Sequence, residues 1–163
     1  MIVCYNVGIK KGENAMTTIY FDMDGTIADL YGVDGWLDNL VAKETRPYDE
    51  AKPLVNLSLL ARYLNILQSV GYRIGIISWL AKNSNEQYDE AVTLSKMKWL
   101  KVHLKSVQFD EINIVPYGTP KTIFSKDHSD ILFDDEIQNR EMWNGNAYTE
   151  TVIIETLKAL LVA

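Results

Sequence analysis

Apolar residues follow two different periods along this chain, and the two periods alternate. Four short runs rich in β-branched and aromatic residues predict buried strands, at residues 17–21, 73–78, 111–115 and 131–133. Three longer stretches show the apolar spacing of an amphipathic helix, at residues 56–70, 84–104 and 151–161. Strands that alternate with helices predict an α/β fold, in which a parallel sheet is covered on both faces in a three-layer Rossmann-like sandwich.

The ends of these elements carry their own signals. Gly71 is expected to end the helix before it, and Ser84 with Gln87 matches a capping box at the start of the next helix. The buried face of that next helix is expected to consist of its apolar residues, namely Val92, Leu94, Met97, Leu100 and Leu104. A short edge strand is expected at Ala147-Tyr148, after an Asn-Gly-Asn break.

Residues 27–55 fit neither period well. They contain several glycines and prolines, and the apolar residues Trp36, Leu37, Leu40 and Val41 group at helical spacing. This predicts one short helix between loops. Since the helix at 56–70 follows directly, residues 27–55 are the only part of the first half that is left to cover a site, and they predict a minimal cap.

Two acidic residues, Asp22 and Asp24, follow the first predicted strand, which Gly25 ends. Because side chains alternate along a strand, both carboxylates share a face and can reach one cation or one phosphorus atom. In an open parallel sheet, ligands bind at the carboxyl ends of the strands. A plainer interpretation is a strand that ends in a turn, since Asp and Gly are common turn residues.

Two further strands deliver polar groups in the same way. The strand at 131–133 leads into Asp134-Asp135, and the strand at 73–78 ends in Ser78. Three strands therefore direct polar side chains to one edge of the predicted sheet, which favours a ligand or catalytic site over a simple turn.

Asp22-Met23-Asp24-Gly25-Thr26, Ser78, Lys121 and Asp134-Asp135 occur in the order of the four motifs of the haloacid dehalogenase-like (HAD) phosphohydrolase superfamily, which the chain resembles over about residues 17–135. The segment from Asp22 to Asp29 also resembles the opening of the 5′(3′)-deoxyribonucleotidase family. The first and last motifs are specific, whereas a single serine or lysine is a weak signal.

The resemblance implies phosphoryl transfer through a covalent intermediate. Asp22 would be the nucleophile that becomes an aspartyl-phosphate, and Asp24 the general acid and base. Ser78 and Lys121 would bind the phosphate, and the lysine would neutralise part of its charge. Without the motif order, a serine at a strand end is more often a turn or cap residue and a lysine more often a solvated surface charge.

The resemblance also implies a Mg²⁺ cofactor. Its expected protein ligands are the carboxylates of Asp22 and Asp134 and the backbone carbonyl of Asp24, with Asp135 in a supporting place. These are oxygen ligands, which Mg²⁺ prefers.

The finer resemblance implies a small-molecule phosphate ester as substrate, in particular a nucleoside monophosphate. The deoxyribonucleotidase family carries a larger helical cap than residues 27–55 can form, so another small phosphate ester or a polynucleotide 3′-phosphate is an open alternative. Trp36 and Trp79 are able to stack on a base and Lys82 lies near Ser78, but their contact with substrate is left open.

A non-enzymatic alternative is a phosphoacceptor receiver-like domain, which also combines acids, a lysine and Mg²⁺. In receivers the acidic pair comes early and the acceptor aspartate lies on a middle strand. Here the middle strand ends in Ser78 and the second acidic pair comes late, so the order favours a hydrolase.

Composition excludes several other classes of protein. A formal net charge of −6 does not fit a surface for polymeric nucleic acid, which is normally basic. One cysteine, Cys4, and two histidines, His103 and His128, exclude an intramolecular disulfide and disfavour a zinc cluster. No apolar run approaches the roughly 18 residues of a membrane span, so no membrane partner and a cytoplasmic location are expected. Oligomeric state is left open.

Residues 1–15 show neither helical nor strand period. Lys11-Gly12-Glu13 can be encoded by a bacterial ribosome-binding sequence, and Met16 follows at a suitable spacing. Residues 1–15 are therefore expected to be a non-functional leader before a single domain at 16–163, with a genuine N-terminal arm as the alternative.

Overall fold

The computed structural model describes residues 16–162, so the expected leader at 1–15 lies outside the described residues. A five-stranded parallel sheet forms its centre, in the order β5-β4-β1-β6-β7. Its strands are β1 (Thr18–Phe21), β4 (Arg73–Trp79), β5 (Glu111–Val115), β6 (Ile131–Phe133) and β7 (Asn146–Tyr148). The four predicted strands and the short edge strand are confirmed.

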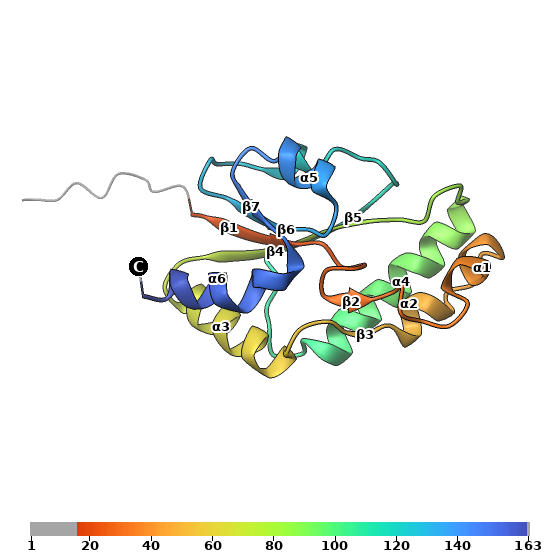
Figure 1. The fold of residues 1–163 in the computed structure, drawn as a ribbon, viewed down its shortest axis with the longest axis horizontal. Coiled ribbons are helices and arrows are strands. Elements are labelled where there is room, and N and C mark those ends of the chain that lie inside the picture. Colours follow the sequence, from red (N-terminus) through yellow and green to blue (C-terminus); the bar gives the residue numbers. More distant parts are fainter. Residues whose placement is uncertain (1–15, 163) are drawn as a thin grey trace, which may run out of the picture.

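Alternating side chains of the central strands bury both faces of the sheet. Ile19 and Phe21 of β1 belong to the larger core cluster, whereas Tyr20 packs with Leu132 and Trp143 on the opposite face. Figure 1 shows α3 and α6 along one face and α5 over the other. Two buried faces explain why these strands are apolar without interruption, and the predicted three-layer sandwich is confirmed.

The helices around the sheet are α3 (Leu57–Ser69), α4 (Glu86–His103), α5 (Ile137–Met142) and α6 (Ile153–Leu160), with 3₁₀ turns η1 (Lys121–Phe124) and η2 (Glu150–Val152). Gly71 follows α3 with a φ of +108°, as expected of a glycine that ends a helix. Within residues 16–162, no helix is long and apolar enough to cross a membrane.

Helix α4 differs from its prediction at its start and in its buried face. Its N-cap is Asn85, whose side chain accepts a hydrogen bond from the Tyr88 backbone N at 2.9 Å, so the expected Ser84 capping box is wrong. Leu94 and Met97 are 70% and 41% exposed. The helix instead buries Tyr88, Val92, Ser95, Lys96, Trp99 and Leu100. Residues four apart share a helix face, and Leu94 and Met97 point away from the face that contains Val92 and Leu100.

Residues 27–55 form more structure than the single helix predicted. They contain β2 (Ala28–Asp29), α1 (Trp36–Val41), α2 (Arg46–Glu50) and β3 (Lys52–Pro53), and β2 pairs with β3 in a two-stranded antiparallel sheet. The expectation of one helix is wrong because Pro47 does not prevent a second helix from forming. It lies in the first turn of α2, where a proline loses no helical hydrogen bond.

This insertion, residues 27–55, packs along α4. Leu30 and Tyr48 pack with Tyr88 and Val92 in a second core cluster. The Tyr88 hydroxyl donates to the Glu44 carbonyl at 2.9 Å, and Trp99 Nε1 donates to the Ala51 carbonyl at 2.7 Å. The insertion is therefore a fixed wall at the carboxyl edge of the sheet (Figure 1).

Candidate active site

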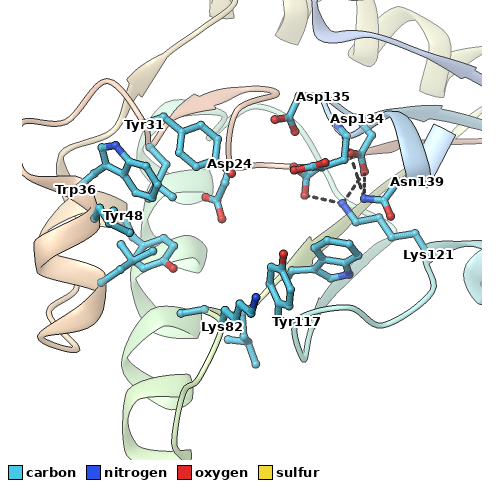
Figure 2. A pocket seen from close by; sticks show the side chains of 18 residues that line it. Asp24, Tyr31, Trp36, Tyr48, Lys82, Tyr117, Lys121, Asp134, Asp135 and Asn139 are labelled. Carbon is cyan, nitrogen blue, oxygen red and sulfur yellow. Dashed lines mark hydrogen bonds and ion pairs between the residues drawn. The ribbon is translucent and has the colours of Figure 1, made fainter.

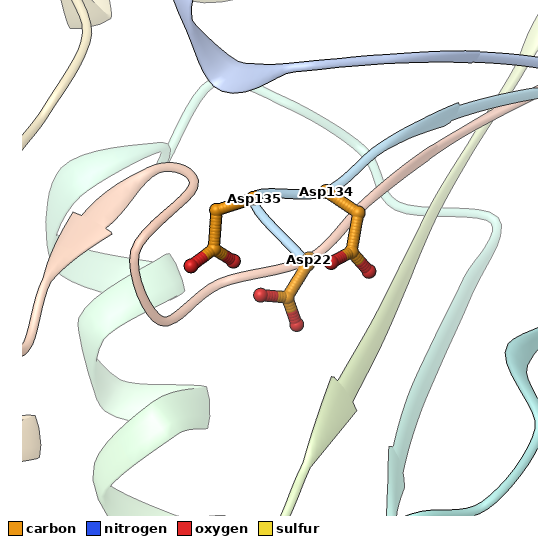
Figure 3. Close-up of side chains that lie close together, drawn as sticks. All are labelled: Asp22, Asp134 and Asp135. Carbon is orange, nitrogen blue, oxygen red and sulfur yellow. The ribbon is translucent and has the colours of Figure 1, made fainter. Parts of the chain in front are cut away.

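The carboxyl ends of β1 and β6 bring three carboxylates together. Asp22 follows β1, and its backbone N donates to the Phe133 carbonyl at 2.9 Å, which extends the pairing of the two strands. Asp134 and Asp135 follow β6 directly, and each of the three residues offers a carboxylate oxygen within 4.8 Å of the others. Figure 3 shows these side chains converging. We call Asp22, Asp134 and Asp135 the acidic edge.

Lys121 is the cation of the acidic edge. It lies at the start of η1, is 3% exposed, and its Nζ donates to Asp22 Oδ1 at 2.7 Å and to Asp134 Oδ2 at 2.6 Å. Burial alone would lower the pKa of Lys121, but the two carboxylates outweigh it and hold that pKa above its ordinary value. Lys126, the other lysine near this position in the sequence, is exposed and pairs with Glu111.

Helix α5 fixes the end of β6. Asn139 Nδ2 donates to both oxygens of Asp134 at 3.2 and 3.3 Å, and Arg140 donates to the carbonyls of Asp134 and Asp135 at 2.7 Å each. Burial raises the pKa of Asp134, and the nearby Asp22 raises it further. The acidic edge is thus held rigidly although its members repel one another.

The turn after β1 is built around Asp135. Gly25 has a φ of +78°, and a Cβ there would lie 2.5 Å from Asp135 Oδ2, so only glycine fits. The Asp135 backbone N donates to the Thr26 hydroxyl at 3.1 Å. Burial, then Asp22 and Asp134, raise the pKa of Asp135 to about 7. Lys121 forms ion pairs with two of the three carboxylates, so hard oxygen donors and unbalanced negative charge make the acidic edge able to bind a metal ion.

Asp24 and Ser78 meet through a lysine that the sequence patterns did not single out. Lys96 of α4 is 1% exposed, and its Nζ donates to Asp24 Oδ2 at 2.5 Å and to Ser78 Oγ at 2.7 Å. The Ser78 side chain is fully buried, and it does not line the cavity beside Asp24. Burial raises the pKa of Asp24, Lys96 opposes this, and Asp22 adds to the rise.

A cavity of about 280 Å³ opens over Asp22, Asp24 and Lys121. Its size is near the lower end for small-molecule sites. Five aromatic residues line it and form what we call the aromatic wall, namely Tyr31, Trp36, Tyr48, Trp79 and Tyr117. Figure 2 shows Tyr31, Trp36 and Tyr48 on one side of the cavity and Tyr117 with Lys82 across from them. The cavity is acidic at one end, and elsewhere it is lined mainly by aromatic and aliphatic side chains.

The aromatic wall is held by contacts between distant segments. Tyr31 and Trp36 meet edge to face with ring centroids 5.0 Å apart, and Trp79 and Tyr117 are also 5.0 Å apart. Trp79 Nε1 donates to the Thr119 carbonyl at 2.8 Å, which ties the end of β4 to the loop before η1.

The structure thus brings Asp22, Lys121, Asp134 and Asp135 into direct contact or close approach, with Asp24 on the same cavity. Trp36, Trp79 and Lys82 all line that cavity. Sequence patterns missed Lys96 and the tyrosines of the aromatic wall. Lys96 had a detectable signal, since it lies four residues from both Val92 and Leu100 on the apolar face of α4.

The fold is shared with the crystal structure of D,D-heptose 1,7-bisphosphate phosphatase from Burkholderia thailandensis. The two structures match with a TM-score of 0.54 and 14% sequence identity, over 90% of this chain and 99% of that one. At this identity the likeness establishes the fold alone, which confirms the predicted Rossmann-like core. No protein-family model and no curated protein matches the sequence.

Proposed function

We propose that the protein is a Mg²⁺-dependent phosphomonoester hydrolase that acts through an aspartyl-phosphate and cleaves nucleoside monophosphates. One observation carries the proposal: Asp22 and Asp24 line the same cavity, and Lys121 joins Asp22 to Asp134 at its acidic end. A phosphatase fold in the structural neighbour supports the same reaction class.

The residues suit a double displacement. A carboxylate oxygen of Asp22 attacks phosphorus, the ester P–O bond breaks, and Asp24 gives a proton to the leaving oxygen. Asp24, now ionised, then takes a proton from the water that attacks the aspartyl-phosphate, which releases phosphate and restores Asp22. Lys121 offsets the charge that accumulates as the phosphate meets Asp22.

The acidic edge fits a hard divalent cation. Asp22, Asp134 and the Asp24 backbone carbonyl would hold it, with Asp135 in support, and the bound cation would supply charge neutralisation for the phosphate dianion. One Lys121 ammonium does not balance the charge of three carboxylates, and the remaining negative charge repels a phosphate dianion. A bound cation would remove this repulsion.

The aromatic wall supports a nucleoside as the leaving group. Flat rings around a cavity stack favourably on a base. The rings of this wall that are at least partly exposed are those of Tyr31, Trp36, Trp79 and Tyr117. The structural neighbour is named for a sugar bisphosphate. A sugar phosphate would gain less from this wall, because it has no flat base to stack on the rings.

A panel of phosphate esters tests the proposal. The purified protein is assayed for phosphate release from nucleoside 5′- and 3′-monophosphates, a sugar phosphate, an aryl phosphate and an oligonucleotide with a 3′-phosphate, each with Mg²⁺ or with EDTA. We expect Mg²⁺-dependent release with the highest kcat/KM on nucleoside monophosphates, and none from Asp22→Asn. Preference for the sugar phosphate or the oligonucleotide would overturn the nucleotide assignment.

The same assay separates the receiver-like alternative. A receiver domain would show long-lived labelling by acetyl phosphate and no turnover of any ester. Activity that persists in EDTA would contradict the metal dependence.

A further inference from the structure

We infer that Lys96 is a positioning residue that orients the Asp24 carboxyl for proton transfer to the leaving group. The inference rests on the proposed function and goes beyond it, because it assigns a role to a buried lysine on α4. Lys96 does not itself line the cavity and forms no ion pair with the acidic edge, so it acts through Asp24.

All three N–H groups of the Lys96 ammonium have acceptors. They are Asp24 Oδ2, Ser78 Oγ at 2.7 Å and the Trp79 carbonyl at 3.0 Å. An ammonium donates three hydrogen bonds and accepts none, so this set is complete. Two of the three acceptors belong to the end of β4, which means that Lys96 ties the Asp24 side chain to the rigid centre of the sheet.

The direction of these hydrogen bonds determines which oxygen of Asp24 carries the proton. Oδ2 must accept from Lys96 whether Asp24 is ionised or neutral, so a proton on Asp24 resides on Oδ1. No donor among residues 16–162 bonds to Oδ1, and Asp24 lines the cavity with its side chain 17% exposed. Lys96 therefore presents the proton-bearing oxygen to the space that the substrate occupies.

The same hydrogen bonds also indicate a supporting role for Ser78. Its hydroxyl oxygen accepts from Lys96 and its side chain is fully buried. Ser78 thus supports Lys96 in this structure, and direct contact with phosphate would require its hydroxyl to leave that position.

A purely structural role explains Lys96 less well. An apolar side chain at the same place on α4 would bury its surface without the desolvation cost of an ammonium. Lys96 is instead enclosed by the Tyr48 ring, 5.1 Å from Nζ, and by the three acceptors. The enclosure holds Asp24 in one orientation in both halves of the reaction.

Leaving-group dependence tests the inference, because the loss of a proton donor slows the departure of a poor leaving group far more than that of a good one. A nucleoside alkoxide leaves poorly without a proton, whereas 2,4-dinitrophenolate leaves readily as the anion. We compare kcat/KM of the wild type and Lys96→Met on a nucleoside monophosphate and on 2,4-dinitrophenyl phosphate. We expect Lys96→Met to lose about 100-fold on the nucleotide and only a few-fold on the dinitrophenyl ester.

Lys101→Met is the matched control, since Lys101 lies on the same helix and is exposed. It should behave as wild type on both esters. Lys96→Gln retains an N–H donor on a side chain that is one bond shorter. It carries the same comparison if Lys96→Met fails to fold by circular dichroism, and it should show a smaller difference between the two esters.

Equal losses on the two esters, or no loss on either, would overturn the role of Lys96 and leave the proposed function standing. A wild type that hydrolyses neither ester would overturn the proposed function itself, and the inference with it. The two failures are therefore distinguishable from the wild-type rates alone.

Discussion

The acidic edge and the aromatic wall of one cavity are built by different means. The acidic edge lies at strand ends and is held by partners that bond to it directly, as Lys121 and Asn139 bond to Asp134 at 2.6 to 3.3 Å. The aromatic wall comes from the insertion, the last residue of β4 and the loop after β5, and its two ring pairs each have centroids 5.0 Å apart. The acidic edge is held mainly by hydrogen bonds and ion pairs, and the aromatic wall mainly by the packing of its rings.

This difference separates chemistry from recognition. Substitutions in the acidic edge should lower kcat for every phosphate ester, because each reacting phosphate contacts the same groups. Substitutions in the aromatic wall should act only on esters whose leaving group reaches the rings. The predictions below test that division.

Asp22→Asn should have the largest effect. The amide is nearly isosteric with the carboxylate but a poor nucleophile, so kcat should fall by about three orders of magnitude or more on every ester that the wild type cleaves. The fold should persist, since the change removes one of three mutually repelling carboxylates. Steady-state kinetics and a thermal melt check both parts. Retention of wild-type turnover would exclude the covalent mechanism.

Lys121→Met should have the next largest effect. It removes the ammonium between Asp22 and Asp134, so kcat should drop by about 100-fold on all esters. KM should change less, because the contacts of the leaving group with the aromatic wall are unaltered. Stability should also fall, because buried carboxylates lose their partner. Lys126→Met is the control, since Lys126 is exposed and pairs with Glu111 outside the cavity. Equal effects of the two substitutions on kcat would contradict a role of Lys121 in the reaction.

Local sequence patterns were sufficient for the sheet and for much of the acidic edge. Buried strands read as continuous apolar runs, and β5 and β6 have the predicted bounds, Glu111–Val115 and Ile131–Phe133. Because parallel strands end at one edge, Asp22 and Asp134 could be placed together before any coordinates. Lys121 required more, namely the order of motifs along the chain.

The rest depends on long-range packing that local patterns do not encode. Nothing in the local sequence distinguishes Lys96 from the exposed lysines of α4 unless the buried face of the helix is known. The apolar pattern does not identify that face correctly, because Leu94 and Met97 are apolar yet exposed. The tyrosines of the aromatic wall are separated by long stretches of sequence. Only the folded insertion brings Tyr31 and Tyr48 to the cavity.

Trp36→Ala should produce a selective and smaller effect. Loss of a ring from the aromatic wall should reduce kcat/KM on nucleoside monophosphates by about 10-fold, as expected for one stacking contact, while a small alkyl phosphate without a ring is cleaved at the wild-type rate. Leu94→Ala, on the exposed side of α4, is a control that should change neither. A uniform loss on both esters would mean that the wall supports the fold or the chemistry instead of recognition.

Asp135→Asn should have the smallest effect, and it should appear as a pH dependence of stability. The folded pKa of Asp135 is raised to about 7, from an ordinary value of about 4, so between these values the folded state holds a proton that the unfolded state has lost. In metal-free protein the free energy of unfolding should therefore fall as pH rises from about 4 to about 7 and level off above that. Asp135→Asn removes this contribution and should be more stable than wild type above pH 7. The gain should be only about 1 kcal/mol, because solvent screens the charge of a partly exposed carboxyl.

Urea unfolding in EDTA across this pH range measures the difference, with Asp38→Asn at an exposed position as control. Added Mg²⁺ should reverse the order, since a bound cation stabilises the ionised carboxylates of the wild type. A variant that follows the wild-type pH curve throughout would show that Asp135 does not share the charge repulsion of the acidic edge.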